Sequence, residues 1–136
     1  LGSGDMAGAD ADCHAPASDW WPYRNQILIT FAAARSLSLG VGRLMIGTVK
    51  SDSTHRDGTS DFVDAMNALV ALQEGGIRVE APAIHLGTVE LVREAGVPRE
   101  LLAWAHSCHK ANVACANCRG CNKYFEVLNE LDGRLG

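Results

Sequence analysis

Residues 104–125 read WAHSCHKANVACANCRGCNKYF and contain four of the five cysteines of this 136-residue chain. The cysteines of this stretch are Cys108, Cys115, Cys118 and Cys121. The last three are spaced C-x2-C-x2-C, and six residues separate the first from the second. Four thiolates are the usual donor set of a closed, tetrahedral zinc site. Together with Gly120, which suits a tight turn, the spacing predicts a compact four-cysteine zinc knuckle and a terminal helix over residues 104–136.

Two other uses of these cysteines stay open. A C-x2-C-x2-C run also binds iron–sulfur clusters, and four cysteines can pair as disulfides. The zinc interpretation is favoured because the count is four, the spacing is short, and no apolar signal segment indicates secretion. His106 and His109 flank Cys108, and with four thiols present they are expected beside the ligands rather than among them.

Composition narrows the class of protein. Hydrophobic residues make up 47% of the chain, which is ordinary for one globular domain. The formal net charge of −4 gives no electrostatic basis for nucleic-acid binding. No apolar run approaches the roughly 18 residues that a membrane span needs. We therefore expect a cytoplasmic protein that binds neither nucleic acid nor a membrane.

Two helices and two strands are predicted before the cysteines. Residues 1–19 are rich in Gly, Ala and Asp and are interpreted as a flexible loop or tail. One helix ends at Gly40 and a second ends at Gly75, while short apolar runs predict strands within residues 41–49 and 77–82. The apolar stripes expected to face the core are Ile27, Leu28, Phe31, Ala32 and Ala34 in the first helix, and Phe62, Met66, Leu69 and Leu72 in the second.

The order of these elements is that of an α/β fold. Short helices are predicted over residues 88–95 and 98–104, after the second strand. We expect a parallel sheet that is incomplete in this chain, since parallel sheets covered on both faces normally have more than two strands. Ligands of such sheets bind at the carboxyl ends of the strands. The loop KSDSTHRD, residues 50–57, follows the first strand and is dense in acids, bases and hydrogen-bonding groups.

Four motifs in a fixed order resemble one protein family. They are Tyr23-Arg24-Asn25 before an apolar helix, IGTV at 46–49 followed by Asp52, IRVEAPAIHL at 77–86 followed by TVELV, and HSC…CANCRGC near the end. Together they resemble the C-terminal half of the 7-cyano-7-deazaguanine synthases over residues 20–131. These enzymes are zinc-containing members of the PP-loop ATP pyrophosphatase group.

The resemblance implies a Rossmann-like, adenine nucleotide alpha hydrolase-like domain at residues 20–103 and a structural Zn²⁺ in the knuckle. It also implies that ATP, with Mg²⁺, activates the carboxylate of 7-carboxy-7-deazaguanine as an adenylate, which ammonia converts through the amide to the nitrile. The family's phosphate loop, Ser-Gly-Gly-x-Asp-Ser, does not occur in this sequence. We therefore expect the chain to be inactive alone, and to act as a homodimer or with a chain that carries the loop.

The resemblance also assigns site residues. Arg24 and Asn25 match the family's active-site pair, and the arginine fork suits phosphate or carboxylate. Asp52 lies where the family has an active-site aspartate near the substrate base, and a carboxylate accepts N–H groups of a guanine-like ring. Three further candidates for substrate binding, by position in the loop, are Lys50, His55 and Asp57.

Other functions stay open beside this one. The chain could belong to another PP-loop adenylating enzyme with a different substrate, because the wording of loop 50–57 departs from the family's. It could be a non-catalytic half-enzyme that binds a partner, which the missing phosphate loop favours. A structural zinc module that reads nucleic acid is a further alternative, but the acidic balance argues against it.

Overall fold

The structure is a computed structural model that describes residues 10, 13–17 and 19–133. The chain divides into two units, one from Tyr23 to Gly87 and one that joins the described residues up to Pro22 to those from Thr88 onward. The elements of the first unit are α1 (Arg24–Leu37), β1 (Arg43–Met45), η2 (Lys50–Thr54), η3 (Arg56–Gly58), α2 (Ser60–Ala71) and β2 (Arg78–Glu80). Helices therefore alternate with strands, and the predicted α/β class is confirmed.

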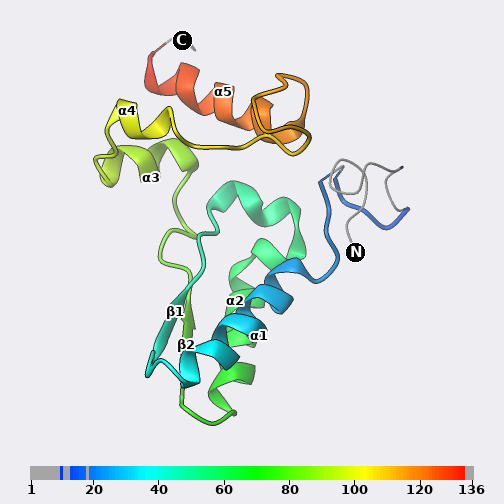
Figure 1. Cartoon of the computed structure of the whole chain (residues 1–136), viewed down its shortest axis with the longest axis vertical. Coiled ribbons are helices and arrows are strands. Elements are labelled where there is room, and N and C mark those ends of the chain that lie inside the picture. The colour runs from blue at the N-terminus through cyan, green and yellow to red at the C-terminus, as the bar shows by residue number, and fades with distance from the viewer. Residues whose placement is uncertain (1–9, 11–12, 18, 134–136) are drawn as a thin grey trace. The chain divides into compact units, whose positions relative to one another are not determined.

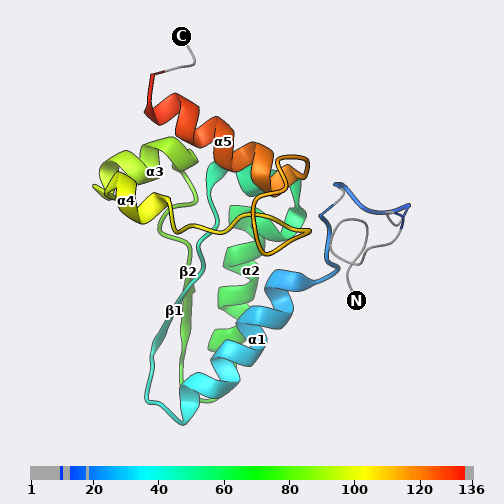
Figure 2. The same ribbon diagram turned by 45° about the horizontal axis from the view of Figure 1, so that its top comes forward.

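The sheet of this unit has two parallel strands, with Leu44 of β1 opposite Val79 of β2. Both helices lie on the same side of the strands (Figures 1 and 2). Leu44 and Val79 contact the core on that side, whereas Arg43 and Glu80 pair at 3.7 Å on the opposite face. The buried core consists of Ile29, Val63, Met66, Val70, Ile77 and Val79. Within this unit the sheet is thus apolar on one face and charged on the other.

α1 buries a different face from the one that the sequence predicts. Ile29 lies in the core and Ala33 packs against it, whereas Ile27, Leu28 and Phe31 are exposed, Phe31 at 74%. The predicted stripe is therefore wrong. α1 is apolar around most of its circumference, so periodicity alone does not select the side that meets the sheet.

α2 confirms half of its predicted stripe. Met66 is in the core and Phe62 packs against it, but Leu69 and Leu72 are exposed. Val63 and Val70 are buried instead. The predicted and observed sets are adjacent rows of the same helix. The position of the sheet, which the helix sequence does not contain, decides between the two rows.

β1 presents an open edge. The 2.9 Å bond from the Ile46 N–H to the Glu80 C=O shows which residues of β1 face β2. Since parallel pairing uses alternate residues, the N–H groups of Arg43 and Met45 point away from β2. Neither N–H has an acceptor among the residues that the structure describes. The row of unpaired groups is the kind of edge on which another strand can pair.

The outer edge of β2 is covered by a side chain of α2. Asn67 Oδ1 accepts the backbone N–H of Val79 at 2.8 Å. This N–H also points away from the partner strand, and Val79 is 4% exposed. A further strand would therefore have to displace Asn67 from β2, whereas no described side chain accepts the outward N–H groups of β1.

The second unit contains three helices within its described residues, α3 (Thr88–Glu94), α4 (Arg99–Leu102) and α5 (Arg119–Leu131). α3 contacts α5, and Figure 2 shows these two helices next to each other. Tyr124 Oη donates to the Leu102 C=O at 2.9 Å, and Arg99 pairs with Asp132 at 2.8 Å. These bonds tie α4 to both the middle and the end of α5. The spans of α3 and α4 confirm the short helices expected over residues 88–95 and 98–104.

The predicted domain boundaries at residues 19 and 103 stay a prediction. Residues 1–9, 11, 12 and 18 of the predicted tail lie outside the described residues. Among the described residues, no helix combines the length and the apolar character that crossing a bilayer would require.

Replacing Asn67 by Ala is expected to lower the free energy of unfolding by about 1–3 kcal/mol, because the buried Val79 N–H would lose its acceptor. Urea denaturation followed by circular dichroism measures the change. Asp64→Ala, at an exposed position of the same helix, is the control. An equal loss in the two variants would contradict the role given to Asn67.

Candidate functional site

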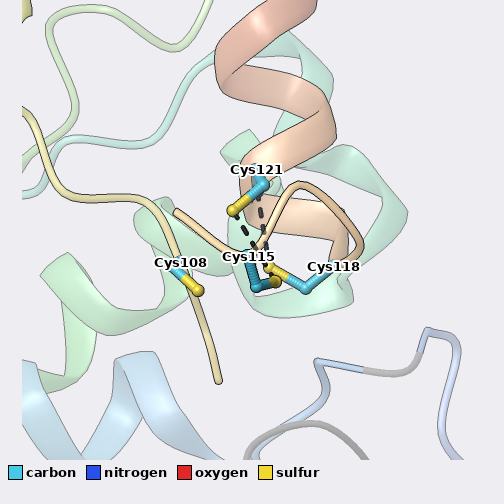
Figure 3. Close-up of side chains that lie close together, drawn as sticks. All are labelled: Cys108, Cys115, Cys118 and Cys121. Carbon is cyan, nitrogen blue, oxygen red and sulfur yellow. Dashed lines mark hydrogen bonds between the residues drawn. The ribbon is translucent and has the colours of Figure 1, made fainter. Parts of the chain in front are cut away.

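Four cysteine sulfurs converge in the second unit. The Sγ atoms that all lie within 4.8 Å of one another are those of Cys108, Cys115, Cys118 and Cys121 (Figure 3). All four are free thiols, and the sulfurs of Cys115 and Cys121 are 3.9 Å apart. Sulfurs at tetrahedral positions around zinc are separated by about 3.8 Å. The cluster could therefore hold one metal ion with little rearrangement.

The chain around the cluster supplies hydrogen bonds to the sulfurs. Cys118 directly precedes the first turn of α5, and its Sγ accepts the Cys121 N–H at 3.5 Å. The same sulfur accepts the His109 N–H at 3.4 Å, and Cys108 Sγ accepts the Lys110 N–H at 3.4 Å. Each bond points the positive end of a peptide dipole at sulfur. The segment thus stabilises thiolates, the form that binds metal.

These contacts separate the thiols by pKa. The Lys110 N–H is the main reason that the pKa of Cys108 falls to about 6. The N–H groups of His109 and Cys121 likewise lower the pKa of Cys118. Burial has the opposite effect on Cys121, which is 1% exposed, and raises its pKa to about 11. Without metal, the cluster therefore combines an ionised thiolate with a protonated thiol at neutral pH.

Gly120 allows the two arms of the knuckle, the segment at Ser107–His109 and the first turn of α5, to lie against each other. A Cβ atom at this position would overlap the Ser107 C=O and would lie 2.7 Å from His109 Nε2. No residue with a side chain fits without moving one arm. His109 therefore packs against the first turn of α5 and is not one of the four clustered ligands, and its buried Nδ1 has no partner in the described part of the chain. His106 is exposed.

The loop after β1 folds into the two short helical turns η2 and η3. Asp52 Oδ2 accepts the Val49 N–H at 3.1 Å and so closes the start of η2. The Lys50 N–H donates to the Leu86 C=O at 2.9 Å, which ties this loop to the segment after β2. A Cβ on Gly58 would lie 2.5 Å from the Asp52 C=O, so only glycine allows η3 to pack this closely on η2.

Asn25 joins the start of α1 to this loop. Its backbone N–H donates to Asp57 Oδ2 at 3.1 Å, and its Nδ2 donates to the Asp57 C=O at 2.7 Å. Arg24 Nε donates to Asn25 Oδ1 at 3.3 Å. Three of the predicted site residues are therefore brought into one hydrogen-bonded group. Asp52 lies beside this group through its contact with Gly58, which follows Asp57 directly.

The other predicted residues of the loop take different positions. Lys50 has an exposed side chain at the start of η2, and His55 is half-buried between η2 and η3. Thr48, by contrast, is 5% exposed just after β1, and its Oγ1 has no hydrogen-bond partner within the described residues. Sequence reasoning did not single out Thr48. Its place at the carboxyl end of an apolar run, where sheet ligands bind, is the signal that could have found it.

In the metal-free protein at neutral pH, iodoacetamide is expected to modify Cys108 first and Cys121 last. The thiolate is the nucleophile, and neutral pH lies above the Cys108 pKa of about 6 but far below the Cys121 pKa of about 11. Lowering the pH to about 5 should protonate Cys108 and slow its reaction about tenfold. Peptide mass spectrometry measures the rates, with exposed Cys13 as the internal reference. Equal rates at Cys108 and Cys121 would contradict the assignment.

Comparisons with known proteins match most of this chain to one family. The sequence profile of the family described as "Queuosine biosynthesis protein QueC" matches residues 3–131. The 7-cyano-7-deazaguanine synthase of Acidobacterium capsulatum is 34% identical over 118 residues, which are 82% of this chain and 50% of the relative. The synthase of Campylobacter fetus is 31% identical over 80% of this chain and 51% of its own length. That of Pyrococcus horikoshii is 32% identical over 83% and 52%.

The chain spans about half the length of these curated relatives. The matched region nevertheless includes both the hydrogen-bonded group of Arg24, Asn25 and Asp57 and all four clustered cysteines. Because the profile covers nearly the whole chain, this protein belongs to the QueC family.

Proposed function

We propose that this chain takes part in the ATP-dependent conversion of 7-carboxy-7-deazaguanine to 7-cyano-7-deazaguanine with ammonia. The observation that carries the proposal is the continuous match of residues 3–131 to a queuosine-biosynthesis family, since it includes both candidate sites. The names of the relatives support the same product. ATP and Mg²⁺ are then the expected cosubstrate and ion, and the cytoplasm is the expected compartment.

Residues at the start of α1 and in the loop after β1 suit this chemistry. Arg24 is the proposed contact for a phosphate group of ATP or of the adenylate, because a guanidinium carries two N–H ends that match phosphate oxygens. Asp52 is the proposed acceptor for N–H groups of the deazapurine ring, because a carboxylate accepts such groups. Lys50 and His55 remain candidates for further substrate contacts, at an exposed and a half-buried position.

Zn²⁺ is the metal proposed for the cysteine cluster. Four thiols, sulfur separations near the tetrahedral value and N–H···S bonds all fit this ion. A site with four protein ligands has no open position for substrate, so the ion would stabilise the fold rather than act on the deazapurine. The cysteines would hold the segment from Ser107 to α5 in place through it.

The proposed partner is a polypeptide that carries the family's phosphate loop, with a second copy of this chain as the other form of assembly. The open edge of β1 supports this proposal, because unpaired N–H groups can pair with a further strand. Exposed apolar side chains on α1, among them Leu28 and Phe31, support it as well. Asn67 on β2 indicates that a strand would join at β1 rather than at β2.

One observation favours a second candidate, a partner-binding half-enzyme without catalysis. Asn25, Asp52 and Asp57 all use side-chain atoms for bonds to the chain's own backbone. Those bonds would be formed in a purely structural loop as well. Another PP-loop enzyme with a different carboxylate substrate is the third alternative, and product analysis separates the three.

The purified chain is expected to hold about one zinc ion, with four sulfurs in the first shell, by metal analysis and X-ray absorption. Gly120→Ala should lose most of this metal, because the added Cβ overlaps the Ser107 C=O. Gly42→Ala, where a Cβ would meet no atom within 4 Å, is the matched control and should keep it. An iron–sulfur spectrum, or a shell dominated by nitrogen, would overturn the zinc assignment.

Catalysis is tested with this chain and a polypeptide from the part of the Acidobacterium capsulatum relative that it does not span. Arg24→Ala should lower kcat about a hundredfold, because an arginine stabilises the charge that develops on phosphate. Asp52→Asn keeps an acceptor for Val49 and should mainly raise KM for the deazapurine. Arg35→Ala and Asp61→Asn, both at exposed positions, are the matched controls.

The chain alone should release no pyrophosphate from ATP. Turnover by the pure chain would defeat the proposal that a second polypeptide supplies the phosphate loop. If the reconstituted pair converts no deazaguanine although it binds and folds, the half-enzyme or a different substrate becomes the better account. A rate within about twofold of the parent in Arg24→Ala would remove Arg24 from the reaction.

A further inference from the structure

We propose that Asn25 and Asp57 are positioning residues that hold the Arg24 guanidinium for an anion, and that neither is itself a substrate contact. The proposal rests on the proposed function in one respect, the assignment of Arg24 as the phosphate contact. It changes the role expected for Asn25, a member of the active-site pair, and for Asp57, a candidate for substrate binding, to support of Arg24. The hydrogen-bonding groups that meet at the start of α1 carry this inference.

α1 lacks a cap from its own neighbouring residues. Tyr23 precedes the helix with a φ of 55° and supplies no side-chain hydrogen bond to its first turn. The Asn25 N–H in that turn instead donates to Asp57 Oδ2, from a residue 32 positions further along the chain. A carboxylate at this end of a helix is favourable because it meets unpaired N–H groups and the positive end of the helix dipole. Asp57 therefore fixes where α1 begins relative to η3.

The amide of Asn25 has only one orientation that satisfies its partners. Its Nδ2 faces the Asp57 C=O at 2.7 Å, and a carbonyl can only accept. Its Oδ1 faces Arg24 Nε at 3.3 Å, and a guanidinium can only donate. A flipped amide would place oxygen against oxygen and N–H against N–H. Since Asn25 is 5% exposed, both ends of its amide are engaged and little of it is available to a ligand.

Arg24 is held at Nε and keeps its outer nitrogens available. Nε is the only atom of its side chain with a hydrogen-bond partner among the described residues, and that partner is Asn25. The Nη1 and Nη2 groups form the two-pronged end that binds phosphate or carboxylate. Holding the inner N–H restricts the long side chain before a ligand arrives, which reduces the entropy lost on binding.

The support reaches back to the loop after β1. Asp57 is followed by Gly58, whose Cα packs so closely on the Asp52 C=O that a Cβ would approach it to 2.5 Å. Asp52 in turn is fixed by the bond from the Val49 N–H at the end of β1. The position of Arg24 is thus set by tertiary contacts with the strand end.

Nuclear magnetic resonance of the full chain tests the proposal through the Arg24 Nε–H group. In the parent this group should be ordered, and in Asn25→Ala its hydrogen exchange should accelerate about tenfold, as expected for loss of one hydrogen bond. Gln26→Ala, at the exposed neighbouring position, should leave it unchanged. Asp57→Asn keeps the backbone C=O and an acceptor oxygen, so it should retain the order. Asn25→Leu replaces Asn25→Ala if the smaller side chain prevents folding.

An Nε–H group as mobile in the parent as in Asn25→Ala would overturn the proposal. Titration with inorganic pyrophosphate then tests the phosphate role of Arg24 separately from the positioning role of Asn25 and Asp57. If the Nε–H is ordered but the Nη signals do not respond, the positioning role stands and the phosphate role of Arg24 fails. In the reconstituted enzyme, Arg24→Ala/Asn25→Ala should lose no more kcat than Arg24→Ala alone, whereas independent residues would lose the product of both effects.

Discussion

The backbone N–H of Asn25 donates to a carboxylate 32 residues away, and the first unit depends on bonds of this kind. Asp52 accepts the Val49 N–H at the end of the first strand, and Asn67 accepts the Val79 N–H on the second. A buried N–H without an acceptor costs about 1–3 kcal/mol, a large share of the stability of a small unit. The first unit therefore needs acceptor side chains at Asp52, Asp57 and Asn67 for its own backbone, whether or not a ligand binds.

In the cysteine knuckle, too, backbone N–H groups donate to side chains, and here the acceptor is sulfur. Cys118 receives N–H groups from both arms of the segment, so the arms are linked to each other even apart from a metal. The N–H groups lower the pKa of Cys118 and Cys108, while burial raises that of Cys121. A divalent ion would lower the pKa of all four thiols, including Cys121, since it stabilises the sulfurs as thiolates.

Some residues of the family's motif form hydrogen bonds within the chain itself, and this affects how functions are assigned to them. Arg24, Asn25 and Asp57 belong to one hydrogen-bonded group, yet only Arg24 has side-chain donor atoms without a partner among the described residues. A motif match gives all three residues the same weight. In our proposal Arg24 meets the ligand, and the other two residues hold it in place. The structure also adds the buried hydroxyl of Thr48, just after β1, as a candidate.

The sequence by itself determined the α/β class, the order of the elements, the cysteine cluster and the family. These features follow from local patterns in the sequence, namely apolar runs, glycines after helices, C-x2-C spacing and motif order. It could not select the buried face of α1, because Ile27, Ile29 and Phe31 are all apolar and only the sheet decides which one enters the core. Nor could it pair Asn25 with Asp57 or place Asn67 on the edge of β2. Those contacts join residues far apart in the chain, and a hydrogen bond depends on distance and direction that exist only after the elements have packed.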